Sequence, residues 1–416
     1  MKKHNISKIE KLLEKGVKIP NPDSVCIGDE VNTEKISGDG VVIHSGCKIF
    51  GSSTLILQGA RLGYEAPVTV ENCQVGPMVD LKGGFFKEAV FLKKVSIGSG
   101  AHVRAGTILE EEARVAHTVG LKQTILFPYV TLGSLINFCD CLMSGGTGNK
   151  DHSEVGSSYI HFNYSPNQDK ATPSLLGNVP DGVMLNQMPI FLGGQGGLVG
   201  PCRLAFGTII AAGSIYRKDE LRPGRLLFTG GGKGGNIRFS PGMYRNIKRI
   251  VANNIIYIAN LIALMQWYLH VRSQFVSNDF PKDLFDGLTN TLKMALDERI
   301  KRLVELCIKM PDSARTYKNI AKENASSLLL QQKKELYDSW PELEGLFKEQ
   351  LHNGGDQSSR DIFLEKIYLG IRKSGKDYIS VIKGLEREEA ETGTLWLKGI
   401  VECITDNTLK IIPLFK

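Results

Sequence analysis

The chain has 416 residues, which is long enough for two or three domains, and its 42% hydrophobic and 23% charged residues are ordinary for a globular protein. Its net charge of +7 is modest, so it suits anionic small molecules such as phosphates and does not predict a nucleic-acid partner. Eight cysteines without a disulfide-like framework, and an N-terminus without an apolar core segment, predict reduced thiols, no secretion signal and a cytoplasmic location.

Residues 1–20 are expected to form a short N-terminal helix, which Pro20 and Pro22 end. From residue 21 to 238 the dominant pattern is an apolar residue at every sixth position, with a gap at Ser37. The matching positions are Val25, Val31, Ile43, Ile49, Leu55, Ile97, Val103, Leu109, Val115, Leu121, Phe127, Leu192, Leu198, Leu204 and Ile210. Neither a helix, with apolar spacings of three and four, nor a simple strand, with a spacing of two, gives this period.

Hexads of this kind predict a parallel β-helix, in which three short strands make one triangular coil and the apolar side chains stack inside it. The fold class is therefore mainly β plus α, with a left-handed β-helix whose handedness comes from known hexad folds and not from the spacing. Within it, residues 145–181 form a long polar stretch that breaks the repeat. Such a stretch is either a binding loop or lid, or a disordered insertion.

Residues 239–416 predict a separate all-α domain, and they contain no recognisable chemical motif. The helical patterns cover Tyr244–Phe275, Asp279–Cys307, Asp312–Tyr337, Pro341–Leu351, Arg360–Lys373 and Asp377–Lys398. The first is almost long enough to span a membrane, but polar residues such as Asn254 and Asn260 interrupt it. We therefore expect a buried core helix and no membrane partner. The segment TGGGKGG at 229–235 predicts a flexible joint between the domains, with Lys233 near the phosphates of a coenzyme.

The segments HFNYSPNQDK, SLLG and IFLGGQGGLVGPCRLAFGTIIAAGSIYRKD carry a resemblance to a known family. Over roughly residues 20–220 the chain resembles the acetyltransferase half of the bifunctional enzymes that make UDP-N-acetylglucosamine. In that half, a left-handed β-helix uses acetyl-CoA to acetylate glucosamine 1-phosphate. The uridyltransferase half, with its Gly-rich nucleotide loop, has no counterpart here, so a nucleotidyltransferase activity is not expected.

The resemblance implies a set of site residues. Arg104 and Lys122 match the cations that hold the sugar phosphate in the family. Lys170 lies one residue away from the position of a further phosphate-binding lysine of the family. Those matching contacts to acetyl-CoA, the expected co-substrate, are Ser157, Asn163, Tyr164, Gly194 and Ala212. The set is coherent, because a phosphate needs fixed cations and a thioester needs small residues and amide donors beside it.

This chain departs from the family pattern at residues that the acetyl transfer itself needs. The family's general-base His and its Tyr are replaced by Ser134 and Asn137, and an Asn that contacts the sugar is replaced by Glu154. Since serine alone is a poor base near neutral pH, a substitute is needed to deprotonate the amine. His161 is the tentative base, and His152 is the other candidate. Otherwise His161 is a polar loop residue without a catalytic role.

A metal site is a weaker possibility. Cys139 and Cys141 with His117, His152 and His161 contain the right atoms for zinc, as in hydratases of the carbonic-anhydrase type, but their spacing favours buried thiols that act as small core residues. No metal is expected.

The leading hypothesis is N-acylation of an amino-sugar phosphate or nucleotide amino sugar, by direct attack of the amine on the thioester. The alternative is a non-catalytic protein that binds or senses sugar nucleotides on the same scaffold, and the distant one is a metal-dependent hydratase. The resemblance also implies a homotrimer with active sites between neighbouring copies.

Overall fold

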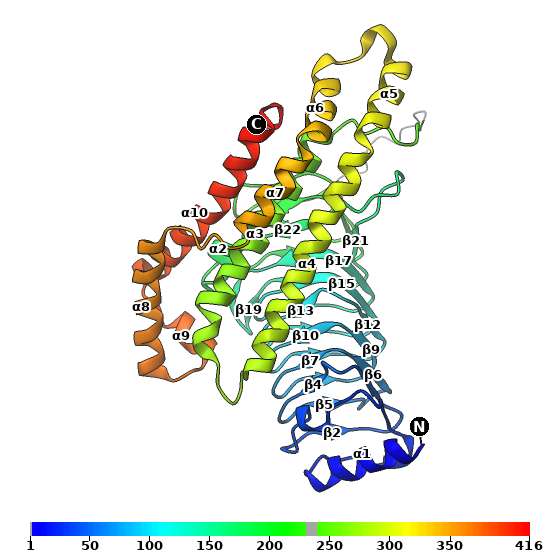
Figure 1. Cartoon of the computed structure of the whole chain (residues 1–416), viewed down its shortest axis with the longest axis vertical. Helices are drawn as coiled ribbons and strands as arrows, with labels where there is room; N and C mark the ends of the chain where they lie inside the picture. Colours follow the sequence, from blue (N-terminus) through cyan, green and yellow to red (C-terminus); the bar gives the residue numbers. More distant parts are fainter. Residues whose placement is uncertain (1, 230–238) are drawn as a thin grey trace.

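The computed structural model describes residues 2–229 and 239–416, so the predicted joint at 230–238, with Lys233, lies outside the described residues. The predicted left-handed β-helix with a C-terminal all-α region is confirmed (Figure 1). The coils stack into a three-sided prism, and helix α1 (Lys2–Glu14) lies across its N-terminal end. Because Ile9 and Leu12 of α1 are buried, this helix covers a core that an open end would expose to water.

Each of the three faces of the prism is a parallel ladder of short strands. The first face contains β2 (Val42–Ile43), β5 (Arg61–Leu62), β8 (Asp80–Leu81), β11 (Ser96–Ile97), β14 (Arg114–Val115), β16 (Thr131–Leu132), β20 (Glu154–Val155), β23 (Phe191–Leu192), β26 (Ile209–Ile210) and β28 (Leu226–Leu227). The second contains β1 (Cys26–Ile27), β3 (Lys48–Phe50), β6 (Val68–Glu71), β9 (Gly84–Lys87), β12 (Ala101–Val103), β21 (Ile160–Phe162), β24 (Gly197–Val199) and β27 (Ile215–Tyr216). The third contains β4 (Leu55–Ile56), β7 (Gln74–Val75), β10 (Ala89–Phe91), β13 (Thr107–Leu109), β22 (Ser174–Leu176) and β25 (Arg203–Leu204).

Two long strands, β15 (Val119–Leu126) and β17 (Ile136–Met143), run around the corner between the second and third faces and belong to both. Along the second face, the register stacks Val103 on Leu121 and Leu121 on Phe138, and all three side chains are fully buried. The predicted six-residue ladder is therefore the inward-facing row of the prism. One coil contains one residue fewer than three hexads. For this reason Leu109 is paired with Leu126, and not with Phe127 as the six-residue spacing predicts.

The segment 145–181 differs from the expected loop. It contains β20, β21 and β22, which continue the three faces in register with the neighbouring coils. Two parts leave the prism: the antiparallel hairpin of β18 (Gly146–Gly148) and β19 (Asp151–His152), and the corner at 163–173. The short helix α2 (Val179–Gly182) follows β22. Polar residues hide the repeat in this segment because its inward row includes His161.

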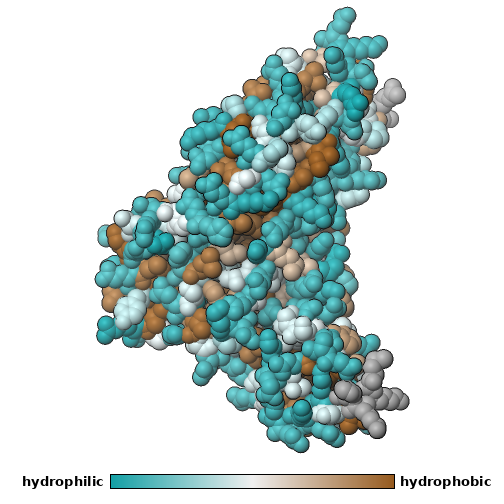
Figure 2. Space-filling model, in the orientation of Figure 1, coloured by the Kyte–Doolittle hydropathy of each residue, from teal (hydrophilic) through white to brown (hydrophobic). Residues whose placement is uncertain are grey.

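The C-terminal helices cover the third face (Figure 1). They are α3 (Ile247–His270), α4 (Lys282–Ile308), α5 (Met310–Ala321), α6 (Ser327–Asp338), α7 (Trp340–Gln350), α8 (Gln357–Ser374), α9 (Tyr378–Lys383) and α10 (Arg387–Ile411). On this face the outward residues are also apolar and buried, as Val90, Ile108 and Ile125 show, because α4 packs against β7, β10 and β13. The side of the helical region seen in Figure 2 is mostly hydrophilic, with scattered apolar side chains.

Helix α3 is the core helix of this region. In the described part of the chain, Ile247–Phe275 is long and apolar enough to cross a membrane by composition, but 83% of its most apolar window is buried inside the protein. Its polar side chains have partners there: the amide of Asn254 donates to the carbonyl of Ala171, and Asn260 accepts from the N–H of Val179. These bonds satisfy polar groups that would otherwise be costly to bury, although Oδ1 of Asn254 has no partner among the described residues.

The side chains that point into the prism determine its stability. We therefore expect substitutions at two neighbouring residues of β3 to differ in their effect on the free energy of unfolding. Replacing the fully buried Ile49 by Ala is expected to lower the free energy of unfolding by about 2–5 kcal/mol, because a cavity is left in the core. Replacing the adjacent, exposed Lys48 by Ala is expected to change it by less than about 0.5 kcal/mol. Urea unfolding followed by circular dichroism measures both, and equal effects would contradict the inward stacking.

Candidate functional site

Six of the residues expected at the site lie together in one pocket of about 410 Å³ at the corner between the second and third faces. They are Arg104, Lys122, Asn137, Asn163, Tyr164 and Lys170. Arg104 and Lys122 follow paired inward residues on consecutive coils, Val103 and Leu121, so the strand register places one cation above the other. Helix α4 adds Glu298 to the wall of the pocket, a residue that the sequence did not indicate.

The pocket has more positive than negative charge. Arg104, Lys122 and Lys170 face two carboxylates, those of Asp140 and Glu298. Partial burial lowers the pKa of Lys122, and the charges of Lys170 and Arg104 lower it further, while Glu298 opposes the shift. An anion bound between these cations would relieve their repulsion, and a phosphate is the anion that a fork of Arg and Lys donors suits.

Asp140 lies buried at the bottom of the pocket, where its carboxylate accepts hydrogen bonds from two side chains. Its Oδ1 accepts from Nη2 of Arg299 on α4 at 2.7 Å, and both side chains are almost fully buried. Its Oδ2 accepts from the side-chain amide of Asn163, and the hydroxyl of Thr172 donates to the backbone carbonyl oxygen of Asn163 at 2.7 Å. The helical region therefore fixes the orientation of Asn163 through one carboxylate.

His161 lies inside the prism and not in the pocket. Its ring is 1% exposed and occupies the inward row of β21, where it is paired with Leu198. Nδ1 lies 2.6 Å from the carbonyl oxygen of Cys139 and Nε2 lies 2.7 Å from Oγ of Ser174, so both nitrogens are engaged. Burial lowers the pKa of His161 to about 4. The tentative assignment of His161 as the base does not fit this position, because a substrate amine has no access to either nitrogen.

The structure pairs Ser134 with a different histidine. Oγ of Ser134 lies 2.9 Å from Nδ1 of His117, and both residues lie on the outer corner between the first and second faces. The sequence indicates His117 only as a possible metal ligand. The signal that identifies the pair is the separation of seventeen residues, which is one coil of this solenoid.

The remaining expected residues lie outside the pocket. Ser157, Gly194 and Ala212 follow Ser134 along the same outer corner, and backbone hydrogen bonds join successive coils there, from Gln195 to Ser157 and from Gly213 to Gly194. Glu154 lies on the first face, where His152 is 3.8 Å from it. A Cβ on Gly194 would come within 2.8 Å of the Ser157 carbonyl oxygen, so only a small residue fits this corner.

No group of three or more His, Cys, Asp or Glu side chains within residues 2–229 and 239–416 is arranged to hold a metal ion. Cys139 and Cys141 are buried, and burial raises the pKa of the Cys139 thiol to about 11. Thiols of this kind are protonated near neutral pH and are poor zinc ligands.

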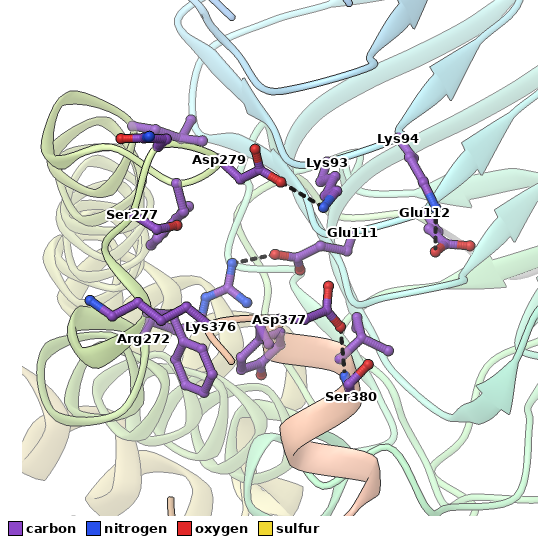
Figure 3. A pocket seen from close by; sticks show the side chains of 16 residues that line it. Lys93, Lys94, Glu111, Glu112, Arg272, Ser277, Asp279, Lys376, Asp377 and Ser380 are labelled. Atoms are coloured by element: carbon purple, nitrogen blue, oxygen red, sulfur yellow. Dashed lines mark hydrogen bonds and ion pairs between the residues drawn. The ribbon is translucent and has the colours of Figure 1, made fainter. Parts of the chain in front are cut away.

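A second cavity of about 610 Å³ lies at the junction of the prism and the helices (Figure 3). Its charged side chains are matched within the cavity: Lys93 pairs with Asp279 at 2.8 Å, and the buried Arg272 pairs with Glu111. Arg272 also stacks on the ring of Tyr378, 3.8 Å from its centre. These pairs join the helical region to the solenoid and leave no excess charge for a ligand.

Comparison with known proteins agrees with the resemblance seen in the sequence. No protein-family model matches the chain. The chain is 26% identical over 227 residues to the bifunctional protein GlmU of Corynebacterium aurimucosum, covering 54% of this chain and 40% of that protein. It is 27% identical over 213 residues to GlmU of Thermotoga maritima, covering 51% of this chain and 42% of that protein. The chain thus spans about two fifths of the length of these relatives.

Among solved structures, a UDP-N-acetylglucosamine acyltransferase from Campylobacter jejuni is 15% identical and matches over 76% of this chain and 93% of its own, with a TM-score of 0.17. That likeness is too small to support an argument. The sequence relatives confirm that about half of the chain is similar to the acetyltransferase half of the bifunctional enzymes.

The buried position of His161 predicts a specific pH dependence of stability. The folded chain holds this ring neutral down to about pH 4, whereas the ring in the unfolded chain takes up a proton below its ordinary pKa of 6.5. Stability is therefore fully present above pH 6.5 and is lost as the pH falls toward 4, by about 2–3 kcal/mol from this group alone.

His161→Gln removes the titrating group and keeps a hydrogen-bonding side chain. Urea unfolding of both proteins between pH 4 and pH 7 is expected to show a smaller loss of stability in the variant. The same pH dependence in the two proteins would contradict the interior position of the ring.

Proposed function

From the similarity to the acetyltransferase half of the bifunctional enzymes, we propose that this chain transfers an acyl group from acyl-CoA to the amine of an amino-sugar phosphate or a nucleotide amino sugar. The observation that carries the proposal is the pocket in which Arg104, Lys122 and Lys170 converge beside Asn163 and Tyr164. We further propose acetyl-CoA as the acyl donor. A cytoplasmic location would fit the cysteines, since all eight are free.

In this proposal the sugar lies on the second face, between the pocket and the outer corner. With the phosphate on Arg104 and Lys122, the ring lies over Gly120 and Asn137, which are adjacent in the outward row. A Cβ at Gly120 would meet no atom closer than 3.9 Å, so this part of the face is flat and open. Asn137 is three residues after Ser134, and the chain turns between them at Leu135, whose φ is 60°, so the two residues lie no more than about 10 Å apart. The amine of the sugar then points toward Ser134 and His117.

The Ser134–His117 pair supplies the base that the family's missing histidine would have provided. As the amine attacks the thioester carbonyl carbon, its proton passes to Oγ of Ser134 and the proton of Ser134 passes to Nδ1 of His117. The tetrahedral intermediate then collapses, the carbon–sulfur bond breaks, and the imidazolium returns the proton to the departing thiolate of CoA. No acyl-enzyme forms in this sequence.

Release of free thiol from acetyl-CoA, with glucosamine 1-phosphate as acceptor, tests the proposal. His117→Ala is expected to lower kcat by about 10²–10⁴-fold, the range of a general base, with little change in KM for the sugar phosphate. His44→Ala, which removes a histidine from an early coil, serves as the control and is expected to leave both constants unchanged. A kcat for His117→Ala equal to that of the unaltered protein would show that this residue is not the base.

The second candidate function is a non-catalytic protein that binds sugar nucleotides. It is favoured by the replacement of the family's His and Tyr by Ser134 and Asn137. The same assay separates the two functions, because tight binding of the sugar phosphate, with no release of thiol from acetyl-CoA in the presence of any amino-sugar acceptor, would decide for the binding protein.

We also propose that three copies assemble through the faces that the helices leave uncovered. Phe191, Ile209 and Leu226 are aligned on the first face and are 40–61% exposed, and Ile160 on the second face is exposed as well. These rows flank the outer corner that carries Ser157, Gly194 and Ala212, so a neighbouring copy seated there would enclose the acyl donor. Apolar rows of this kind are typical of contacts between proteins.

Light scattering after gel filtration tests the assembly. The double variant Phe191→Glu/Ile209→Glu is expected to change the mass from that of a trimer to that of a monomer, because two charges would be buried in each contact. Leu395→Glu, at a residue of α10 that is 60% exposed, is the matched control and is expected to remain trimeric. A trimeric double variant, or a monomeric unaltered protein, would refute the assembly through this face.

A further inference from the structure

The pocket continues into a groove along helix α4. This groove has a volume of about 510 Å³ and shares Lys122 and Glu298 with the pocket. It lies between α4 and the corner at Ala105 and Gln123. The two spaces therefore form one depression whose inner end is the phosphate pocket and whose outer end is bounded by the helical region.

The outer part of the groove provides further positive charge. Lys293 and Lys301 line it from α4, and both side chains belong to exposed residues. They are eight residues apart, which places them on one side of the helix at a separation of about 12 Å along its axis. The other cation there, Arg302, is held by Glu298 at 2.6 Å and by Glu305 at 2.8 Å. Asp297 lies between these two lysines on the helix and is, with Glu298, one of two carboxylates that face four cations in the groove, which keeps an excess of positive charge. Lys293 and Lys301 are the groove's additional contacts for an anion.

The wall of the groove also includes a buried hydrogen-bond acceptor without a partner among the described residues. Gln123 is 5% exposed, and its Oε1 has no hydrogen-bond partner among the described residues. A buried amide oxygen without a partner costs free energy, and a donor brought by a ligand would remove that cost. A ribose hydroxyl or the N–H of a nucleobase is a donor of this kind, whereas the two phosphodiester groups of a nucleotide sugar carry no proton at neutral pH and can only accept.

We propose that the groove along α4 binds the distal phosphate and the nucleoside of a nucleoside-diphosphate amino sugar. This inference rests on the proposed function and narrows its acceptor from the sugar phosphates to the nucleotide sugars. The phosphate joined to the sugar occupies the pocket at Arg104 and Lys122. The next phosphate lies toward Lys293 or Lys301, and the nucleoside donates to Gln123.

Titration calorimetry of the full chain with UDP, ADP and glucosamine 1-phosphate tests the inference. At least one of the nucleoside diphosphates is expected to bind more tightly than glucosamine 1-phosphate. Lys293→Glu/Lys301→Glu is expected to weaken nucleoside diphosphate binding by about tenfold or more and to leave glucosamine 1-phosphate binding nearly unchanged. Arg104→Ala is expected to weaken both kinds of ligand.

The matched control is Lys318→Glu/Lys334→Glu, which makes the same change in net charge at exposed positions of α5 and α6. It is expected to bind all probes as the unaltered chain does, and an equal loss of affinity in this control would overturn the inference. So would a nucleoside diphosphate that binds no more tightly than the sugar phosphate while Arg104→Ala still weakens the latter, an outcome that leaves the proposed function intact. Absence of binding of every probe would instead refute the proposed function, and the inference with it.

Discussion

The burial of the outer side of the third face is the constraint on which the rest of this structure depends. A bare prism would expose Val90, Ile108 and Ile125 as a continuous apolar row, and burying each such side chain is worth about 1.5–3 kcal/mol. Helix α4 covers this row and then passes beside the corner between the second and third faces, where Arg299 contacts Asp140. The same packing that hides the row thus brings Glu298 and Arg299 to the pocket.

Buried ion pairs fix where the helices lie on the solenoid. Arg299 pairs with Asp140 at one corner, and Arg272 pairs with Glu111 further along the prism. Burying such pairs contributes little net stability, but leaving one partner alone costs about 3–5 kcal/mol, so alternative positions of the helices are excluded. Next to them, burial raises the pKa of Glu110 to about 7, and its carboxyl accepts a hydrogen bond from Tyr268. The ion pairs at this junction therefore determine where the helices lie on the solenoid, and the apolar contacts stabilise that arrangement.

The sequence predicts the solenoid well because one residue type at one period determines it. Ile97, Val103 and Leu121 are inward where the hexads place them. The prediction is less accurate where polarity and burial disagree. On β21 the apolar Ile160 and Phe162 face outward and the polar His161 faces inward, so a hydrophobicity pattern assigns that strand to the wrong register. The sequence predicts Asn163 beside the pocket but not Glu298 or Arg299, because α4 carries no motif and reaches the corner only through tertiary packing.

A stacked solenoid also explains how a catalytic group can change position without a change of fold. Equivalent corner positions recur once per coil, separated by the strand spacing of about 4.8 Å. The position that holds a histidine in the family is Ser134 here, and His117 occupies the equivalent corner one coil earlier, within hydrogen-bond distance of it. In the proposed mechanism, the hydroxyl of Ser134 lies between substrate and imidazole and so bridges that one-coil shift. The proposed phosphate pocket is built on the opposite corner of the same face and includes a residue of α4, so the proposed base and the anion site can vary independently.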